Sequence, residues 1–505
     1  MSELSVLLHD VPTIDPAADA IEFDGKWYSW ARLAGTIGEV RAALAEMKLG
    51  RDARVGILMR SRPSAFAAVL AVVAGDACMV SINPLLPDER LATDLLALAL
   101  PVVIGESADL ARPSVRDAIR ASGSALIELP GILDGAALLA PSASPPAGMR
   151  LTEPGVIVEM LTSGTTGAPK RVSLKRDAFE RSFAAALSYE KGRRASDTAR
   201  LRPGTTILSG PMSHIGGLWG ALTCIAGGRK ACLLERFTVA GWRDAVVRHR
   251  PKVAGTVPAG LRMILDADIP REDLASLSAI RTGAAPLDPA IVAEFWTRYR
   301  IPVLSNYGAT EFSGAVAGWT MKDFAAFHAS KTESVGRFQP GVIGRVIDPG
   351  NGEEVSAGIE GVLEMRSEQF GNGGAWLRTT DRAVIDADGF LFIRGRADLA
   401  INRGGFKVHP DDVNKALESH PAVREAVTVG IADRRLGAVP VTAVMLKAGV
   451  ASPSEEDFAD FARAHLLPYQ VPSKILVVDE VPRTESMKPA LTEVRKLFVA
   501  GLDAA

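Results

Sequence analysis

The residues best suited to chemistry form the segment Leu161-Thr-Ser-Gly-Thr-Thr-Gly-Ala-Pro-Lys170, which lies between two β-like runs, Val156–Leu161 and Arg171–Lys175. Gly164 and Gly167 let the backbone adopt conformations closed to other residues and approach a ligand closely. Four hydroxyl side chains and Lys170 offer hydrogen-bond donors to a polyphosphate. The pattern predicts a phosphate-binding loop between two strands, and therefore an enzyme that uses a nucleotide.

This segment differs from the phosphate loop of kinases and GTPases. That loop needs Gly-Lys-Ser/Thr at the start of a helix, whereas Pro169 separates Gly167 from Lys170 here. Different downstream chemistry is therefore expected. The alternative for the string alone is a solvated connector, because many Ser/Thr/Gly-rich loops have no ligand.

The composition favours a globular enzyme with several structural units. The chain has 505 residues, of which 47% are apolar, and this is enough for ordinary buried cores. Fifty-seven Lys and Arg residues nearly balance 59 Asp and Glu residues, so no overall field attracts nucleic acid or an anionic membrane. A small molecule is the expected partner.

Cysteine usage and hydropathy predict a cytoplasmic protein. Cys78, Cys224 and Cys232 have neither disulfide-like nor metal-like spacing, and we interpret them as reduced core thiols. The apolar stretch Ala65–Asp76 is too short to span a membrane, and no basic-then-apolar signal opens the chain.

The elements that must position the loop follow an α/β pattern. The runs Val55–Met59, Pro101–Gly105 and Ser124–Leu129 alternate with helical stretches at Ser64–Ala74 and Asp88–Leu98, which favours parallel sheets covered by helices. Between residues 350 and 394, short strands with turn signals at Asp348–Gly352 and Asp386–Gly389 predict a small antiparallel, barrel-like section. After Arg396 a compact α+β unit is expected, with helices at Pro410–Ser419 and Ser454–His465 and strands at Ala426–Val429 and Val441–Lys447.

Further motifs follow the loop along the chain. They are Pro211-Met-Ser-His-Ile-Gly-Gly217, Asn306-Tyr-Gly-Ala-Thr-Glu311, Arg378-Thr-Thr-Asp381, Gly395-Arg-Ala-Asp398, Arg403-Gly-Gly-Phe-Lys407 and Pro482-Arg-Thr-Glu-Ser-Met-Lys488. Together with the loop, and in this order, they resemble the adenylate-forming superfamily of acyl-CoA synthetases, peptide-synthetase adenylation domains and luciferases, most of all a stand-alone acyl-CoA ligase. The resemblance spans almost the whole chain.

The resemblance implies a fold with two domains that have different roles. It implies a large N-terminal domain, residues 1–396, with helix-covered mixed sheets, a small β-barrel-like section, and the ATP and acyl pocket. It also implies a small, mobile α+β C-terminal domain, residues 397–505, which carries a lysine loop and rotates on a hinge near Asp398. A homodimer is plausible by family habit alone.

The resemblance also implies roles for ATP, Mg²⁺ and coenzyme A. The β- and γ-phosphates of ATP would be held by Thr162, Ser163, Gly164, Thr165, Thr166, Gly167 and Lys170. The adenosine would be contacted by Gly283, Ala284, Ala285, Asn306, Tyr307 and Gly308, with Asp381 on the ribose and Arg396 beside ribose or phosphate. Thr310 would meet the α-phosphate, and Glu311 would bind Mg²⁺.

The carboxylic acid and the thiol have their own implied residues. The acyl pocket would contain His214, Gly217, Trp219, Thr256, Phe312 and Gly314, and Gly404, Gly405 and Lys407 would line the route of coenzyme A. Because no charged side chain in this lining could fix a second carboxylate, the acid should be hydrophobic and could be bulky. His214 would act as a gate between the acyl pocket and the thiol channel, the alternative being a hydrogen-bonded structural histidine.

The chain departs from the family pattern at several positions. Thr380 replaces the usual glycine before Asp381, and Lys407 stands where arginine is common, so a bidentate phosphate contact is lost there. Lys488 would bridge the substrate carboxylate and the α-phosphate, but Met487 replaces the preceding glycine and Pro489 follows. The charge for adenylation is present, whereas its delivery is in question.

Four functional hypotheses follow. The first is an acyl-CoA ligase that forms acyl-AMP and pyrophosphate from the acid and MgATP, and then the CoA thioester. A variant has weak or absent adenylation and converts a supplied acyl-adenylate. The second alternative transfers the acyl group to the phosphopantetheine of a carrier protein. The last is a non-catalytic nucleotide-binding protein, which would not need Lys170, Glu311, Asp381 and Lys488 together.

Overall fold

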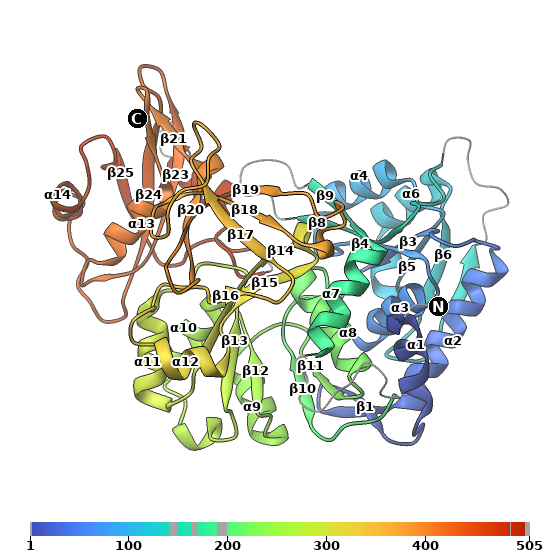
Figure 1. Cartoon of the computed structure of the whole chain (residues 1–505). Coiled ribbons are helices and arrows are strands. Elements are labelled where there is room, and N and C mark those ends of the chain that lie inside the picture. The colour runs from blue at the N-terminus through green and yellow to red at the C-terminus, as the bar shows by residue number, and fades with distance from the viewer. Residues whose placement is uncertain (1–2, 141–148, 163–169, 189–198, 485, 500–505) are drawn as a thin grey trace. The chain divides into compact units, whose positions relative to one another are not determined.

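The computed structural model describes residues 3–140, 149–162, 170–188, 199–484 and 486–499 (Figure 1). The chain forms two compact units. The described part of the first unit contains residues 3–140, 149–162, 170–188, 199–328 and 367–374, and that of the second contains residues 329–366, 375–484 and 486–499. The expected division at residue 396 stays a prediction.

A seven-stranded sheet carries the predicted phosphate loop in the first unit. Its order is β7 (Ala137–Ala140), β6 (Ala125–Leu129), β5 (Val102–Glu106), β3 (Arg54–Leu58), β4 (Cys78–Ile82), β8 (Val156–Thr162) and β9 (Lys170–Lys175). The strands from β6 to β8 pair in parallel, while β7 and β9 are antiparallel at the two edges. Every residue of β3, β4 and β5 is buried, as expected for strands covered on both faces.

Two further sheets complete the first unit. One has the order β10 (Thr205–Leu208), β11 (Lys230–Leu233), β1 (Asp19–Phe23) and β2 (Lys26–Ser29). The other runs from β12 (Val253–Gly255) through β13 (Ala279–Thr282) and β14 (Val303–Ala309) to β15 (Gly314–Gly318). In each, three neighbouring strands are parallel and the fourth is antiparallel. Parallel neighbours place their carboxyl ends at one sheet edge, where α/β proteins bind ligands.

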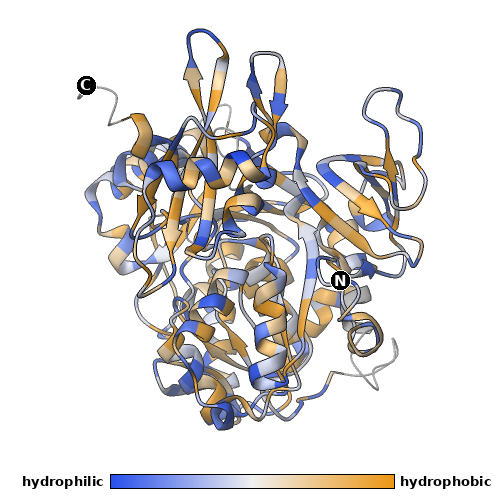
Figure 2. Cartoon of the chain, turned by 90° about the vertical axis from the view of Figure 1, so that its left-hand side faces the viewer, coloured by the Kyte–Doolittle hydropathy of each residue, from blue (hydrophilic) through white to orange (hydrophobic). Residues whose placement is uncertain are grey.

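Helices cover these sheets. Those of the first unit are α1 (Glu3–Asp10), α2 (Trp30–Glu46), α3 (Pro63–Ala74), α4 (Asp88–Leu98), α5 (Ser107–Leu110), α6 (Pro113–Ser122), α7 (Arg176–Ser188), α8 (Ile215–Ala226), α9 (Val239–His249), α10 (Pro258–Asp266), α11 (Pro289–Tyr299) and α12 (Met321–Phe327). All residues of α3 are buried, and this helix lies in the largest core cluster. Figure 2 shows the mixture of hydrophobic and hydrophilic residues on the more exposed helices.

The second unit begins with an antiparallel sheet. Its order is β17 (Ile343–Ile347), β18 (Gly361–Arg366), β19 (Leu377–Ile385) and β20 (Leu391–Arg396), and the short strand β16 (Arg337–Phe338) bridges to Phe390. The expected turns are present, because the Asp348 carboxylate accepts a hydrogen bond from the Gly350 amide and the Asp386 carboxylate accepts one from the Asp388 amide. The antiparallel organisation predicted for residues 350–394 is therefore confirmed, with the sheet beginning slightly earlier.

An α+β section follows in the same unit. Its sheet has the order β22 (Phe406–Val408), β21 (Ile401–Arg403), β24 (Gly437–Leu446) and β23 (Val423–Asp433), and β25 (Lys474–Val478) pairs with β24 in parallel. Its helices are α13 (Pro410–Glu418), α14 (Glu455–His465) and α15 (Leu491–Val499). The helix predicted at Ser454–His465 is confirmed as α14, and Ser454 caps it through a reciprocal capping box with Asp457.

The strand predicted at Ala426–Val429 is longer than expected. Polar residues flank the apolar run, but the ladder with β24 extends from Val423 opposite Leu446 to Asp433 opposite Gly437. The Asp433 carboxylate accepts hydrogen bonds from two turn amides, and Gly437 adopts a φ of 80°. This turn chemistry extends the pairing beyond the apolar residues.

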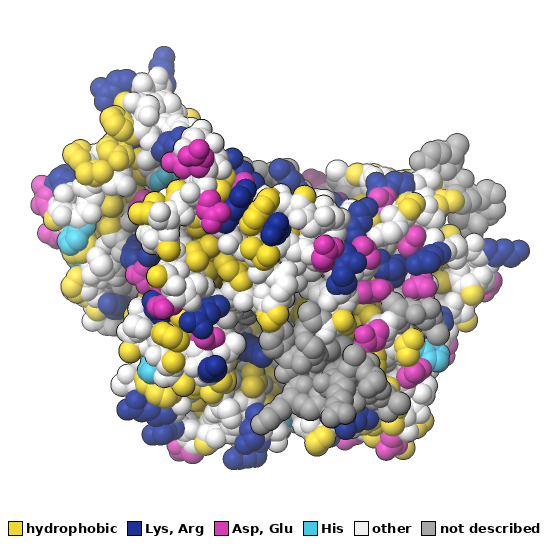
Figure 3. Space-filling model, viewed as in Figure 1, with side chains coloured by type: hydrophobic (Ala, Val, Ile, Leu, Met, Phe, Trp, Pro, Cys, Tyr) yellow, Lys and Arg dark blue, Asp and Glu magenta, His cyan; other side chains and the backbone are white. Residues whose placement is uncertain are grey.

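The remaining predictions about thiols and membrane helices agree with the structure. Cys78, Cys224 and Cys232 are buried and not disulfide-bonded. Within the described ranges, no helix has both the length and the apolar character needed to cross a membrane. On the face shown in Figure 3, basic and acidic side chains are intermixed, in keeping with the nearly neutral net charge.

A buried ion pair joins β8 to the centre of its sheet. Arg54 on β3 makes two hydrogen bonds to Glu159 on β8, with Nε–Oε1 and Nη2–Oε2 distances of 2.8 and 2.9 Å. Both side chains are nearly inaccessible, at 4% and 3% exposure. The Arg54–Glu159 pair fixes the strand that leads into the predicted phosphate loop. Burial and the nearby Glu159 carboxylate also raise the pKa of the Cys78 thiol to about 12.

We predict that Glu159→Gln destabilises the protein by about 3 to 5 kcal/mol, because it leaves the Arg54 charge buried without its counter-ion. The change in unfolding free energy is measured by urea denaturation. Glu493→Gln is the matched control, since its 2.8 Å pair with Lys496 is exposed and should contribute below about 1 kcal/mol. Equal effects of the two substitutions would contradict a structural role for the buried pair.

Candidate active site

The predicted phosphate loop joins two paired strands. Thr162, at the end of β8, lies opposite Lys170, at the start of β9, and the Lys170 side chain is exposed. The expectation of a loop between two strands is thus confirmed at both flanks. The loop itself, with Ser163, Gly164, Thr165, Thr166 and Gly167, lies outside the described residues, and its phosphate contacts stay a prediction.

Arg171 anchors β9 immediately after Lys170. Its Nη1 atom donates a 2.9 Å hydrogen bond to the Ser81 carbonyl at the end of β4, and its Nη2 atom lies 3.1 Å from an Asp94 carboxylate oxygen on α4. Burial lowers the pKa of the Arg171 guanidinium, and Asp94 opposes that shift. A charged side chain therefore anchors the second strand of the hairpin as well.

The ends of β13 and β14 lie side by side. Asn306 on β14 donates a 2.9 Å hydrogen bond from Nδ2 to the carbonyl of Thr282, the last residue of β13. A Cβ at Gly283 would lie 2.4 Å from the Asn306 Oδ1 atom, so a larger residue there would displace the Asn306 side chain. Ala284 follows with a φ of 71°. The sequence-predicted adenosine residues Gly283, Ala284 and Asn306 are therefore adjacent.

Close backbone packing shapes the segment after β14. A Cβ at Gly308 would lie 2.4 Å from the Gly314 carbonyl oxygen, so β15 can pair this closely only with glycine. Between them, Thr310 and Glu311 form a single 3-10 turn, Thr310–Phe312, and the Glu311 side chain is exposed. The turn presents the predicted Mg²⁺ ligand at the end of the strand that carries Asn306.

The neighbouring aromatic residues occupy two environments. Phe312 is 3% exposed and packs against Phe370, with ring centroids 5.7 Å apart, and its carbonyl accepts a hydrogen bond from the buried Gln369 side chain. The half-buried Tyr307 ring lies 6.0 Å from that of Phe312. Phe312 thus supports Tyr307 from the core. Sequence reasoning missed Gln369 and Phe370, because nothing in their spacing connects them to residue 312.

Helix α8 forms another wall of the site. His214 is its N-cap residue, and the Leu218 amide donates a hydrogen bond to the His214 carbonyl. A Cβ at Gly217 would lie 2.1 Å from the Pro211 carbonyl oxygen, which explains the glycine at this close approach. The helix therefore packs directly on the segment that precedes it and fixes the backbone of His214.

Trp219 brings α8 to the Gly314 strand. A Cβ at Gly314 would lie 3.9 Å from the Trp219 indole, and the ring is held edge-on by Phe179 and Phe183, at centroid distances of 4.9 and 5.5 Å. Three predicted acyl-pocket positions, Gly217, Trp219 and Gly314, thus lie in one continuous region.

Two hydrogen bonds close this arrangement. Ser209 after β10 donates from its hydroxyl to the Gly255 carbonyl at 3.2 Å, and the Thr256 amide donates to the Arg281 carbonyl at 3.1 Å. Thr256 therefore lies between the segment before α8 and the β13 end. Thr256 and Asn306 both form hydrogen bonds to carbonyls of β13, next to Gly283. No sequence motif indicated the role of Ser209.

We predict that Gly217→Ala destabilises the protein by about 1 to 3 kcal/mol and lowers turnover, because the added methyl group clashes with the Pro211 carbonyl. Gly216→Ala is the matched control, since a Cβ there meets nothing within 4 Å, and it should be neutral or stabilising by up to about 1 kcal/mol. Denaturation midpoints and initial rates are compared for both variants. A Gly217→Ala protein with wild-type stability and turnover would contradict the assignment.

In the second unit, Asp381 and Arg396 are cross-strand partners in β19 and β20. The Asp381 amide donates a 3.0 Å hydrogen bond to the Thr379 hydroxyl. Arg396 makes a two-point contact with the predicted hinge residue Asp398, at 2.8 and 2.6 Å. Arg396 thus connects the ribose candidate to the hinge candidate within one unit.

The glycine pair Gly404–Gly405 forms the turn between β21 and β22. The φ angles are 57° and 92°, which is the backbone handedness that favours a two-residue hairpin loop of glycines. Arg403 fixes this hairpin by donating hydrogen bonds to the Tyr469 and Val471 carbonyls at 2.9 and 2.8 Å. The Lys407 side chain is exposed on the second strand.

The lysine loop has a positive φ angle at Met487, which is unfavourable for a residue with a side chain. Met487 has a φ of 62°, in the region that favours glycine. The loop is closed by the Thr484 amide, which donates to the Lys488 carbonyl at 2.8 Å, and by the Met487 amide, which donates to the Thr484 carbonyl at 2.9 Å. Arg483 also donates to the Met487 carbonyl, at 3.0 Å. Lys488 is therefore held in a tight turn despite the loss of glycine.

We predict that Met487→Gly is more stable than Met487→Ala by about 1 kcal/mol, because both remove the same side-chain contacts and only glycine removes the strain of positive φ. Chemical denaturation of the pair isolates the backbone contribution. An alanine variant as stable as the glycine variant would show that the loop stores no such strain.

Comparisons with known proteins agree with this arrangement. Residues 10–373 match the family model "AMP-binding enzyme", and residues 412–488 match "AMP-binding enzyme C-terminal domain". A fatty acid–[acyl-carrier-protein] ligase, ScoC of Streptomyces coeruleorubidus, is 31% identical over 68% of this chain and 67% of its own length. A probable CoA ligase, CCL5 of Humulus lupulus, is 26% identical over 95% of this chain and 89% of its own length.

The fold is also similar to that of a solved enzyme. The ATP-bound structure of MatB from Rhodopseudomonas palustris has a TM-score of 0.80, with 21% identity and 98% of each chain covered. At this identity the similarity concerns the fold, a mixed α/β architecture with a large N-terminal and a small C-terminal domain.

Proposed function

We propose that this chain, a member of the AMP-binding enzyme family and an AMP-forming acid–thiol ligase, activates a hydrophobic carboxylic acid with MgATP and transfers the acyl group to coenzyme A. In the first step a carboxylate oxygen attacks the α-phosphorus of ATP, and pyrophosphate leaves. In the second, the thiol sulfur attacks the acyl carbon of the adenylate, and AMP leaves. The product is an acyl-CoA thioester.

One observation carries this proposal. The first unit brings the predicted adenosine residues Gly283 and Asn306 and the predicted acyl-pocket residues Thr256, Gly314 and Trp219 into one chain of contacts. These residues come from five separate segments. A protein that only bound nucleotide would need no apolar wall next to the adenosine residues.

The nucleotide residues fit ATP in their chemistry. Gly283 leaves backbone open beside Asn306, and the half-buried Tyr307 ring offers a flat apolar surface to adenine. In the second unit, Asp381 offers a carboxylate that can accept hydrogen bonds from a ribose diol. Lys170 and the loop after Thr162 are assigned to the β- and γ-phosphates.

Glu311 fits Mg²⁺, since this ion favours one or two carboxylates together with phosphate oxygens and water. Its side chain is exposed at the end of the strand that carries Asn306. When bound, the ion neutralises charge on the phosphates as pyrophosphate departs. Thr310 orients the α-phosphate beside it.

The pocket wall selects a hydrophobic acid. Trp219, held by Phe179 and Phe183, offers an aromatic surface, and Gly314 adds no side chain beside it. His214, fixed at the start of α8, is assigned to the gate through which the thiol meets the acyl group. None of the apolar wall residues named here is a lysine or arginine that could pair with a second carboxylate, so a monocarboxylic acid is favoured.

Two loops of the second unit contribute to different half-reactions. Lys488 neutralises charge between the carboxylate and the α-phosphate during adenylation, and the Gly404–Gly405 turn leaves space for a slim pantetheine arm during thioester formation. Arg396 and Asp398 form the proposed hinge. The strained Met487 lowers the rate of the first step relative to a glycine-containing loop.

A carrier protein is the second candidate acceptor. The relative ScoC is named as an acyl-carrier-protein ligase, and it has the higher identity of the two relatives described above. Free coenzyme A and a phosphopantetheinylated carrier protein, supplied separately, distinguish the two acceptors by which one forms a thioester.

We predict that Lys488→Ala lowers acid-dependent pyrophosphate release at least about 100-fold, because it removes a charge used in the adenylation transition state. Thioester formation from a supplied acyl-adenylate should stay near the wild-type rate. Both half-reactions are measured with hydrophobic aryl, polycyclic and fatty acids, and Lys496→Ala, an exposed lysine of α15, serves as the control.

Three outcomes would change the proposal. Equal losses in both half-reactions would mean that the effect of Lys488 is not specific to adenylation. Thioester from supplied adenylate alone, in the wild type, would mean that adenylation is weak or absent. ATP binding without either reaction would favour a non-catalytic nucleotide-binding protein.

A further inference from the structure

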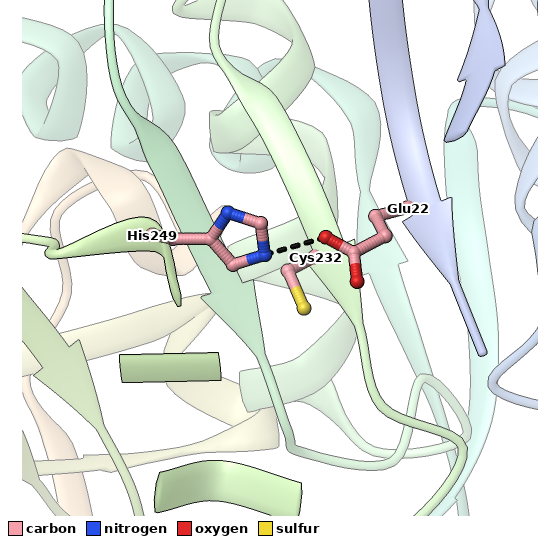
Figure 4. Close-up of side chains that lie close together, drawn as sticks. All are labelled: Glu22, Cys232 and His249. Atoms are coloured by element: carbon pink, nitrogen blue, oxygen red, sulfur yellow. Dashed lines mark ion pairs between the residues drawn. The ribbon is translucent and has the colours of Figure 1, made fainter. Parts of the chain in front are cut away.

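A second group of chemically active side chains lies in the first unit, apart from the residues assigned above. Glu22 on β1, Cys232 on β11 and His249 at the end of α9 place a carboxylate oxygen, a sulfur and a ring nitrogen within 4.8 Å of one another (Figure 4). Glu22 and Cys232 are 1% and 2% exposed, and the His249 side chain is 9% exposed. Such a group in a core requires a physical explanation.

The sheet register builds this group. Glu22 pairs in parallel with Cys232 on one side and antiparallel with Trp27 of β2 on the other, so the three side chains share one face. The Trp27 ring contacts His249 edge-on, with centroids 5.7 Å apart. Strand pairing therefore positions two of the side chains, and an aromatic contact orients the third.

One proton lies at the centre of this group. His249 Nε2 lies 2.5 Å from Glu22 Oε2, an ion pair when the imidazole is protonated, and 3.2 Å from Arg248 Nη1. Glu22 Oε2 is buried and has no hydrogen-bond partner among the described residues. A divalent cation in place of the proton would bind both atoms.

The surrounding charges permit a cation. Arg248 lies 2.5 Å from the other Glu22 oxygen, Oε1, and its own charge is also paired with Asp244 at 2.7 Å. Lys230 lies 4.0 Å from Asp19. The two nearby basic residues thus each have an acidic partner outside the cluster, and Arg248 also forms a hydrogen bond with the Cys232 sulfur, which a bound ion would replace.

We propose that Glu22, Cys232 and His249 form a site for a zinc-like divalent cation that ties β1, β11 and α9 together. Sulfur, imidazole and carboxylate in one group suit Zn²⁺ better than Mg²⁺ or Ca²⁺, which favour oxygen ligands. Zinc–ligand distances of about 2.0 to 2.3 Å would separate the Glu22 oxygen and the His249 nitrogen to roughly 3.3 Å, a small side-chain adjustment. Water can complete a tetrahedral site.

The test uses the full-length protein after removal of metals with a chelator. Co²⁺ is added as a spectroscopic probe, and Zn²⁺ is then titrated to displace it. We expect one equivalent of Co²⁺ per chain with a sulfur-to-cobalt charge-transfer band, and displacement by one equivalent of Zn²⁺. Cys232→Ser should abolish the band and weaken Zn²⁺ binding at least about 100-fold, since loss even of an outer-shell partner costs 10- to 100-fold.

Cys224→Ser is the matched control, because Cys224 is a buried thiol of the same unit whose sulfur faces the Arg229 carbonyl, and it should retain the band. If Cys232→Ser fails to fold, the Cys78→Ser/Cys224→Ser variant, in which Cys232 is the remaining cysteine, must keep it. Absence of a stoichiometric cobalt–sulfur band in the folded wild type overturns the proposal. An unchanged band in folded Cys232→Ser does so equally, and a proton shared by Glu22 and His249 then accounts for the contact.

Discussion

The buried ion pair between Arg54 and Glu159 is the constraint on which the candidate active site depends most. Two charges in a sheet core are tolerated only when they satisfy one another, so the pair favours one position of β8 relative to β3, across the intervening strand β4. Arg171 anchors the start of β9 through Asp94 and the Ser81 carbonyl. Charged contacts of Glu159 and Arg171 therefore anchor the two strands that flank the predicted phosphate loop.

Close backbone approach plays the same role around the rest of the site. Gly217, Gly283 and Gly308 each lie where a Cβ would be 2.4 Å or less from another atom, and each joins two elements that carry predicted binding residues. In the second unit, positive φ angles at Gly404 and Gly405 form the hairpin assigned to coenzyme A. Met487 adopts such an angle without being glycine, so the lysine loop contains a local strain.

Sequence patterns were most informative where local chemistry decides structure. The helix at Ser454–His465, the strands flanking the phosphate loop and the turn at Asp386 follow from short-range signals, and the structure confirms them. The contacts that assemble the site do not follow from such signals. Arg54 and Glu159 are 105 residues apart, and Asn306 and Thr282 are 24 apart, so their pairing is decided by strand order and register. The cluster of Glu22, Cys232 and His249 was invisible for this reason, because the spacing of the cysteines alone gave no metal-like pattern.

The account's central claim is that this scaffold makes an acyl-adenylate, and isotope exchange tests it most directly. Labelled pyrophosphate is incubated with the protein, MgATP and single hydrophobic carboxylic acids, without coenzyme A, and label entering ATP is measured. The account predicts exchange that requires both the enzyme and a hydrophobic acid, since exchange reports reversible attack of the carboxylate on the α-phosphorus. A protein that binds ATP but exchanges no label with any acid of a broad panel would contradict the claim.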